Sequence, residues 1–209
     1  MKTFEAAYAK EEYASALQVL QKNSASIPTG LYHYNVGTTE AALKHWAQAR
    51  YHFILASRAG MNSDALTNNL KITESELNVG KLENPIGVRD HLFQGAMIAA
   101  DGWLTTLSLL ILVIGLWSMR KVRDLRTMLV TLALVLMPLG LNLWIDSWTK
   151  SIVLEPHQIQ EGPSAIFGTT GELPAGILLI TKKQEGWDEI IYPARYQGWI
   201  KSNSLLRLE

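Results

Sequence analysis

Three histidines in the first quarter of the chain are the residues best suited by type to bind a metal ion. Imidazole is the commonest protein ligand of transition metals, and the candidates are His33, His45 and His52. His45 and His52 would share one side of a helix only if a single helix ran through both, whereas the pattern breaks near Lys44. No set of carboxylates follows to orient them. We therefore expect surface histidines and no bound metal.

No other pattern points to catalysis. The chain has no cysteine, which excludes thiol nucleophiles, disulfides and Cys-ligated zinc. It contains no GxSxG, HExxH or P-loop sequence. The 19 basic and 19 acidic residues balance, with no basic stripe beyond one short loop, so nothing indicates a nucleic-acid partner. We expect neither an enzyme nor a cofactor, and the elements must position binding surfaces instead.

The middle of the chain differs from the rest because residues 102–119 and 127–145 carry no charge. As helices, each run would be about 27 Å long, close to the hydrocarbon thickness of a bilayer. The alternative is a pair of buried core helices, which usually show a polar stripe. The pattern predicts a transmembrane helical hairpin over residues 102–145, in which Gly115, Gly140 and Asn142 are suited to helix packing within lipid.

The short turn 120–126 between these runs sets the expected topology. It carries four cations against one acid, namely Arg120, Lys121, Arg123 and Arg126. Short basic loops stay on the cytoplasmic side, so we expect both terminal parts outside, in the periplasm of a bacterial inner membrane. The N-terminal MKTFEAAYAK shows no apolar signal region. Either a signal peptide has been removed or the topology is reversed, and we favour removal.

Residues 1–83 contain a repeat with a period of 33 residues, since Tyr13, Ala16 and Leu20 recur as Trp46, Ala49 and Phe53. The second copy resembles the tetratricopeptide repeat. The residues expected to pack its helix crossing are Gly37, Trp46, Ala49, Phe53 and Ala56. The resemblance implies a small helical solenoid closed by a capping helix over 62–78. Two repeats are fewer than the usual minimum, so we expect support from a partner or from the chain itself.

The inner side of this solenoid is the expected site for a partner peptide. The residues on it would be Tyr34, Thr38 and Ala41, with Lys71 of the capping helix nearby. Plain solvated surface is an equal alternative for each of them. Residues 84–101 are expected to form a short helix in the membrane interface, ending at Asp101.

After a linker over 146–162, the pattern changes to short β-like runs at 177–181, 189–192 and 199–201. The order Gly186-Trp187, then Gly198-Trp199-Ile200, resembles bacterial SH3-like domains and implies a small all-β barrel over 163–209. The face with Trp187 and Trp199 would serve as core and rim, or bind a peptide or cell-wall ligand. The predicted fold class is a mixed multidomain membrane protein: an all-α TPR-like solenoid, an α-helical transmembrane hairpin and this SH3-like barrel.

This domain order, the LYHYNVG and NNL stretches and Trp103 resemble the BatE family of the bacterial aerotolerance operon. The resemblance implies an inner-membrane subunit that works with Bat proteins carrying von Willebrand A domains and with a MoxR-type AAA+ ATPase, in aerotolerance or envelope stress. The expected function is a non-catalytic scaffold or adaptor. The alternative is a membrane-anchored SH3-like module that binds cell-wall peptide or peptidoglycan.

Overall fold

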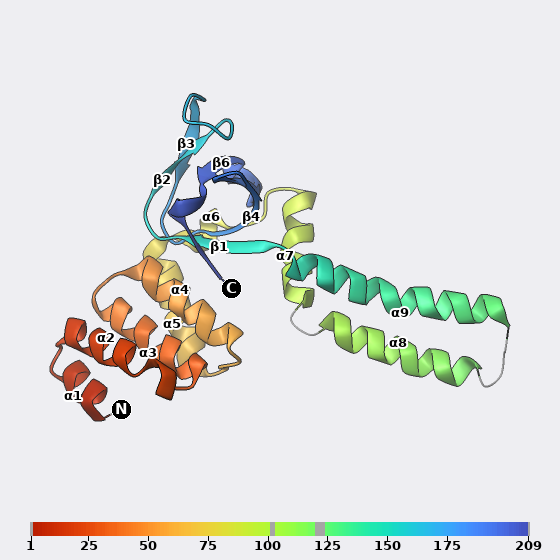
Figure 1. Ribbon diagram of the computed structural model, residues 1–209, viewed down its shortest axis with the longest axis horizontal. Coiled ribbons are helices and arrows are strands. Elements are labelled where there is room, and N and C mark those ends of the chain that lie inside the picture. Colours follow the sequence, from red (N-terminus) through yellow and green to blue (C-terminus); the bar gives the residue numbers. More distant parts are fainter. Residues whose placement is uncertain (1, 101–102, 120–123, 209) are drawn as a thin grey trace. The chain divides into compact units, whose positions relative to one another are not determined.

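The computed structural model describes residues 2–100, 103–119 and 124–208, and these divide into two compact units. Unit 1 combines Met1–Asn84 with Thr149–Glu209, and unit 2 is Pro85–Trp148. Figure 1 follows the chain through both units, from the helices at its beginning to the strands at its end. The two halves of the chain that flank the apolar segment therefore fold together.

The first part of unit 1 is a series of helices that pack on their neighbours in sequence (Figure 1). They are α1 (Lys2–Ala9), α2 (Tyr13–Lys22), α3 (Thr29–Ala42), α4 (Trp46–Arg58), α5 (Asp64–Leu77) and α6 (Val79–Leu82), with a 3-10 turn at Ser24–Ser26. Ala16 and Leu20 of α2 are buried in one cluster, and their counterparts Ala49 and Phe53 of α4 are buried in the next. The repeated small and large residues thus fill corresponding places in two helix layers.

The second part of unit 1 is one seven-stranded sheet with the strand order β3-β2-β6-β5-β4-β1-β7. The strands are β1 (Thr149–Val153), β2 (His157–Gln160), β3 (Thr169–Leu173), β4 (Leu178–Gln184), β5 (Trp187–Tyr192), β6 (Gly198–Lys201) and β7 (Leu205–Arg207), with 3-10 turns at Ala194–Tyr196 and Ser202–Ser204. Neighbouring strands are antiparallel throughout. The curved sheet buries one face around Leu179, Ile190 and Ile200.

This architecture corrects the predicted fold class of a TPR-like solenoid beside a small SH3-like barrel. The sheet has seven strands and begins at Thr149, and its core includes Val79 of α6, with Leu77 and Leu82 packed against it. The prediction failed because short runs such as β1 and β2 obtain their strand conformation from pairing with strands far along the chain, which local pattern does not reveal. Helices and sheet form one compact unit, so the support expected for the short helical series comes from the chain itself.

Unit 2 contains α7 (Val88–Ala100), α8 (Trp103–Met119) and α9 (Leu125–Asp146), and α8 packs along α9. Among the described residues, one helix is long and apolar enough to cross a membrane, at Met128–Asp146 of α9. The apolar part of α8, Leu104–Trp117, is shorter. The predicted two-span hairpin is therefore wrong as a fold assignment: both runs are uncharged in the sequence, but of the helices within the described residues α9 alone meets the length and apolarity of a span.

Large apolar side chains on α8 and α9 are mostly exposed within the described structure, including Leu109, Val113, Met137 and Leu143. Buried core helices would have such residues covered. At the end of α9, Trp148 lies 4.9 Å from the ring of Phe93 of α7 and 5.0 Å from Trp144, measured between ring centroids. This aromatic cluster ties α7 to the end of α9 within unit 2.

Candidate functional site

The residues proposed to line a peptide groove lie on α3 and α5, but most of them are engaged within the helices. Tyr34 packs against Phe53, with the ring centroids 6.0 Å apart, and its hydroxyl accepts a hydrogen bond from Asn69 Nδ2 at 3.4 Å. The Thr38 hydroxyl donates to the carbonyl of Tyr34 at 2.9 Å. Ala41 packs on the same cluster as Tyr34, while Lys71 is exposed on α5.

The helix crossing expected around Gly37 has a close contact at its centre. A Cβ atom at Gly37 would lie 2.8 Å from the Phe53 ring and 3.2 Å from the carbonyl oxygen of Ala49. Ala49, Phe53 and Ala56 are completely buried. Trp46 is half-buried at the first position of α4. These residues position α3 against α4.

Arg50 is the residue of this region that the sequence analysis missed. Its side chain, 3% exposed, donates to both carboxylate oxygens of Glu83 at 2.6 and 2.8 Å and to the Gly176 carbonyl at 2.5 Å. Glu74 accepts a further bond at 3.1 Å, and Glu83 accepts from the backbone N–H of Leu178 at 2.7 Å. The sequence does indicate its role, because an arginine between Ala49 and Phe53 lies near the buried side of a helix. A charge buried there must be paired, since an unpaired buried charge is strongly destabilising.

Two of the three histidines considered as metal ligands lie side by side. His33 of α3 and His52 of α4 have their Nδ1 atoms 3.0 Å apart, so one ring donates to the other. Burial and the charge of His33 lower the pKa of His52 to about 4, and burial also lowers the pKa of His33. His45 lies apart from this pair, beside Glu40. In the part of the chain that the structure describes, no group of three or more potential ligands could hold a metal ion.

The two tryptophans of the sheet lie on its outer face. Trp187 opposes Lys201 and Glu189 opposes Trp199 across β5 and β6, whereas the intervening Asp188 and Ile200 are buried inside. Both tryptophans are half-buried. The Lys201 ammonium lies 6.0 Å from the centre of the Trp187 ring. Trp199 also opposes Gln160 of β2, so this face continues toward the β2–β3 hairpin.

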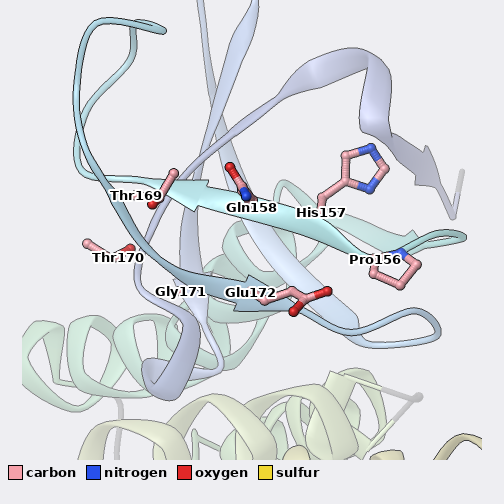
Figure 2. A pocket seen from close by; sticks show the side chains of 7 residues that line it. All are labelled: Pro156, His157, Gln158, Thr169, Thr170, Gly171 and Glu172. Atoms are coloured by element: carbon pink, nitrogen blue, oxygen red, sulfur yellow. The ribbon is translucent and has the colours of Figure 1, made fainter.

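A hollow of about 500 Å³ lies along that hairpin, and Figure 2 shows the side chains that line it. It is lined by Pro156, His157, Gln158, Thr169, Thr170, Gly171 and Glu172. Gln158 and Glu172 are directly opposite each other on β2 and β3, and both are exposed. The lining is polar and carries one carboxylate, without a nucleophile and base in hydrogen-bond contact among these residues. Such a surface is suited to bind a polar segment of another molecule.

The residues predicted to pack the membrane segment or to set its topology differ in their surroundings. Gly115 of α8 lies directly against Thr131 of α9, and Gly140 has open space around it. Asn142 donates to the carboxylate of Asp146 at 3.2 Å. Arg126 is exposed at the start of α9. Three of the four topology residues, Arg120, Lys121 and Arg123, lie outside the described residues.

Comparison with known proteins gives no further guide: no family model, no curated protein and no solved structure matches this chain.

Proposed function

We propose that this chain is a non-catalytic, membrane-attached scaffold or adaptor subunit. The observation that carries the proposal is the construction of unit 1, in which residues from before and after the apolar segment share one core. Arg50, Glu83 and Gly176 join those two parts through buried hydrogen bonds. One compact unit with helical and β surfaces is therefore joined through the chain to apolar helices, an arrangement suited to holding partners at a membrane.

The construction of unit 1 also constrains topology. Its two chain segments belong on the same side of any membrane that α9 enters, because the hydrogen bonds of Arg50 to Gly176 and of Tyr51 to Arg207 cannot form through a bilayer. We propose that this side is the periplasm of a bacterial inner membrane and that the basic turn 120–126 faces the cytoplasm, with α9 as the helix that enters the membrane. The exposed apolar side chains of α8 and α9 support burial in lipid.

The partners proposed are those that the BatE resemblance implies: membrane proteins with von Willebrand A domains and a MoxR-type AAA+ ATPase, acting in aerotolerance or envelope stress. Their support is the resemblance of the sequence alone. The surfaces offered to them are the side of α3 and α5 where Thr38 is half-buried and Lys71 is exposed, and the outer face of the sheet.

The test is purification of the tagged chain from native membranes in mild detergent, followed by identification of the proteins that come with it. A scaffold should recover a defined set of membrane partners in fixed ratio. A matched chain whose residues 102–145 are replaced by an unrelated apolar segment with the same basic turn separates assembly from anchoring. Equal recovery by both would reduce the apolar helices to an anchor, and recovery of no defined partner by either would refute the scaffold.

A second candidate function is binding of cell-wall peptide or peptidoglycan by the sheet. It is favoured by the placement of Trp187 and Trp199 on one outer face, where aromatic rings can stack on a ligand. Because Val79 of α6 completes the core of the sheet, the test needs the full chain and not the β segment alone. Sedimentation with purified peptidoglycan that is lost in Trp187→Ala and Trp199→Ala variants would favour this function over scaffolding.

A further inference from the structure

The sheet of unit 1 has two edges, and the chain covers one of them with its own helix. β7 ends the strand order on one side, where the carbonyl of Arg207 accepts a hydrogen bond from Tyr51 at 3.3 Å and the carbonyl of Leu208 accepts one from Arg58. Both donors belong to α4. That edge is therefore closed to further strands.

The opposite edge is β3, and within residues 124–208 its one strand neighbour is β2. A strand with a single neighbour presents every second N–H and C=O group outward. Thr169 to Glu172 are all exposed, and the space around Gly171 is open where a side chain would lie. The edge of the sheet is therefore exposed over these four residues of β3.

β3 also lacks most of the features that usually protect an edge. Natural edge strands carry lysine, proline or inward-pointing charge, or twist away through bulges. The sequence TTGEL contains neither lysine nor proline, and the irregularity in its pairing lies at one end, between Ile159 and Gln160 of the partner strand. Gly171 and Glu172 keep regular pairing with β2 and are exposed, whereas Leu173 is buried in the core.

The charge around this edge is of one sign. Between residues 151 and 181 the chain carries Glu155, Glu161 and Glu172 and no lysine or arginine. Glu172 lies on β3 itself and is one of the residues that line the hollow (Figure 2). A second copy of the chain pairing edge to edge would bring two such acidic sets together, which is unfavourable. A basic segment is complementary.

The loop between β2 and β3 adds an apolar contact to this surface. Ile166 is 90% exposed and Phe167 is 46% exposed at the end of the hairpin. The Phe167 ring lies over Gly162, where a Cβ atom would approach it to 2.8 Å, so the ring is held in place by the loop. Two exposed apolar residues at the end of an acidic edge are suited to contact an apolar side chain of a bound segment.

We propose that β3 docks an extended segment of a partner protein, rich in lysine or arginine, that adds to the sheet as a further strand. The backbone of that segment hydrogen-bonds to the outer edge of β3, and every second side chain lies over the hollow beside Gln158 and Glu172. An apolar side chain of the segment contacts Ile166. This inference rests on the proposed scaffold function, because it names the chemistry of one partner.

The test uses the full chain in detergent micelles and a fluorescent ten-residue peptide of alternating lysine and valine. Two further peptides carry backbone N-methyl groups, one on every valine and the other on every lysine. Because successive N–H groups of a strand point to opposite sides, strand addition requires one methylated peptide to lose affinity by about tenfold or more while the other binds as the parent does. Equal binding by all three would overturn backbone pairing.

Protein variants locate the site. Glu172→Lys should weaken binding of the parent peptide by about tenfold, whereas Glu76→Lys, the same charge change at an exposed position of α5, should leave it nearly unchanged. Gly171→Pro, which distorts the backbone in the middle of β3, should also weaken binding. Equal loss in Glu172→Lys and Glu76→Lys would reduce the effect to net charge and refute the docking edge.

Two more measurements separate this proposal from its alternatives. Sedimentation of the chain without peptide reports self-association: a dimer abolished by Gly171→Pro would make a second copy the occupant and overturn a basic partner. Co-purification of membrane partners by the Glu172→Lys chain distinguishes failure of the β3 docking edge from failure of the scaffold function. If partners are still recovered in full, the scaffold stands and β3 is not their docking edge, whereas a chain that recovers no partner in any form fails as a scaffold.

Discussion

Arg50 carries a full charge in an almost dry position, and its partners explain how this is tolerated. The guanidinium pairs through two parallel hydrogen bonds with Glu83, and its remaining contacts reach Glu74 and a backbone carbonyl. Bidentate pairing of this kind fixes geometry as well as charge. The same Glu83 carboxylate accepts the N–H of Leu178 at the start of β4, so a single ion pair orders α4, α6 and the sheet together.

Replacing Arg50 by methionine should destabilise unit 1 by about 3–5 kcal/mol, because it leaves the Glu83 carboxylate without its cation in a largely buried place. Chemical unfolding of the full chain in detergent, followed by tryptophan fluorescence, measures the change. The double variant Arg50→Met with Glu83→Gln should recover part of the loss, since no uncompensated charge remains and the amide oxygen still accepts from Leu178. A double variant as unstable as the sum of both single changes would contradict this explanation.

The pair of His33 and His52 makes a prediction about pH. The pKa of His52 is lowered to about 4 from an ordinary value of 6.5, so the unfolded chain binds a proton between these values that the folded chain does not. Stability should therefore fall as the pH decreases from about 6.5 toward 4, by at most about 1.4 kcal/mol per pH unit from this group. His52→Gln should flatten that part of the profile of unfolding free energy against pH. An unchanged slope would show that other groups cause it.

At the scale of elements, the local sequence predicts those helices whose burial pattern is local. The repeat from Ala16 to Ala49 marks α2 and α4, and Ser63 caps α5 by accepting the N–H of Leu66 at 3.2 Å. The strands before residue 163 were not predicted, because β1 is defined by pairing with β4 and β7. α6 is not predicted for a similar reason: Val79 and Leu82 are too few to give a helical pattern, and only the completed sheet provides the burial site of Val79.

The crossing of α3 and α4 depends on the absence of a side chain at Gly37. Gly37→Ala should lower the unfolding free energy by about 1–3 kcal/mol, because the added methyl group meets the immobile, fully buried Phe53 ring. Gly80→Ala in α6 is the matched control: its surroundings are open, and alanine is the better helix former. Thermal unfolding of the two variants beside the parent gives the comparison. Equal midpoints for Gly37→Ala and Gly80→Ala would show that this contact does not set the helix packing.

At the scale of the whole molecule, the division of the chain is the feature least visible in the sequence. Composition separates residues 1–101, the apolar middle and the C-terminal third, and on this basis the sequence predicts separate domains. The structure instead joins the first and last parts into unit 1 through long-range bonds, among them Tyr51 to Arg207 and Tyr192 to Glu83. Contacts over more than a hundred residues leave no local pattern, since the two tyrosine hydroxyls bond to backbone carbonyl oxygens, which every residue carries.

Unit 1 makes a topological prediction that is independent of charge. Cysteines introduced at Ser24 and at Asn203, both exposed and from opposite ends of the chain, should react alike with a membrane-impermeant thiol reagent, since the native sequence has no cysteine to interfere. In cells with a permeabilised outer membrane, both should be labelled if unit 1 is periplasmic, and a cysteine at Lys121 should be labelled only after lysis. Equal labelling at residues 24 and 203 tests whether both belong to unit 1. The contrast with residue 121 tests on which side of the membrane unit 1 lies. Labelling of one terminal site without the other would contradict the shared core, whereas labelling of residue 121 alone would keep that core and reverse the orientation of the chain.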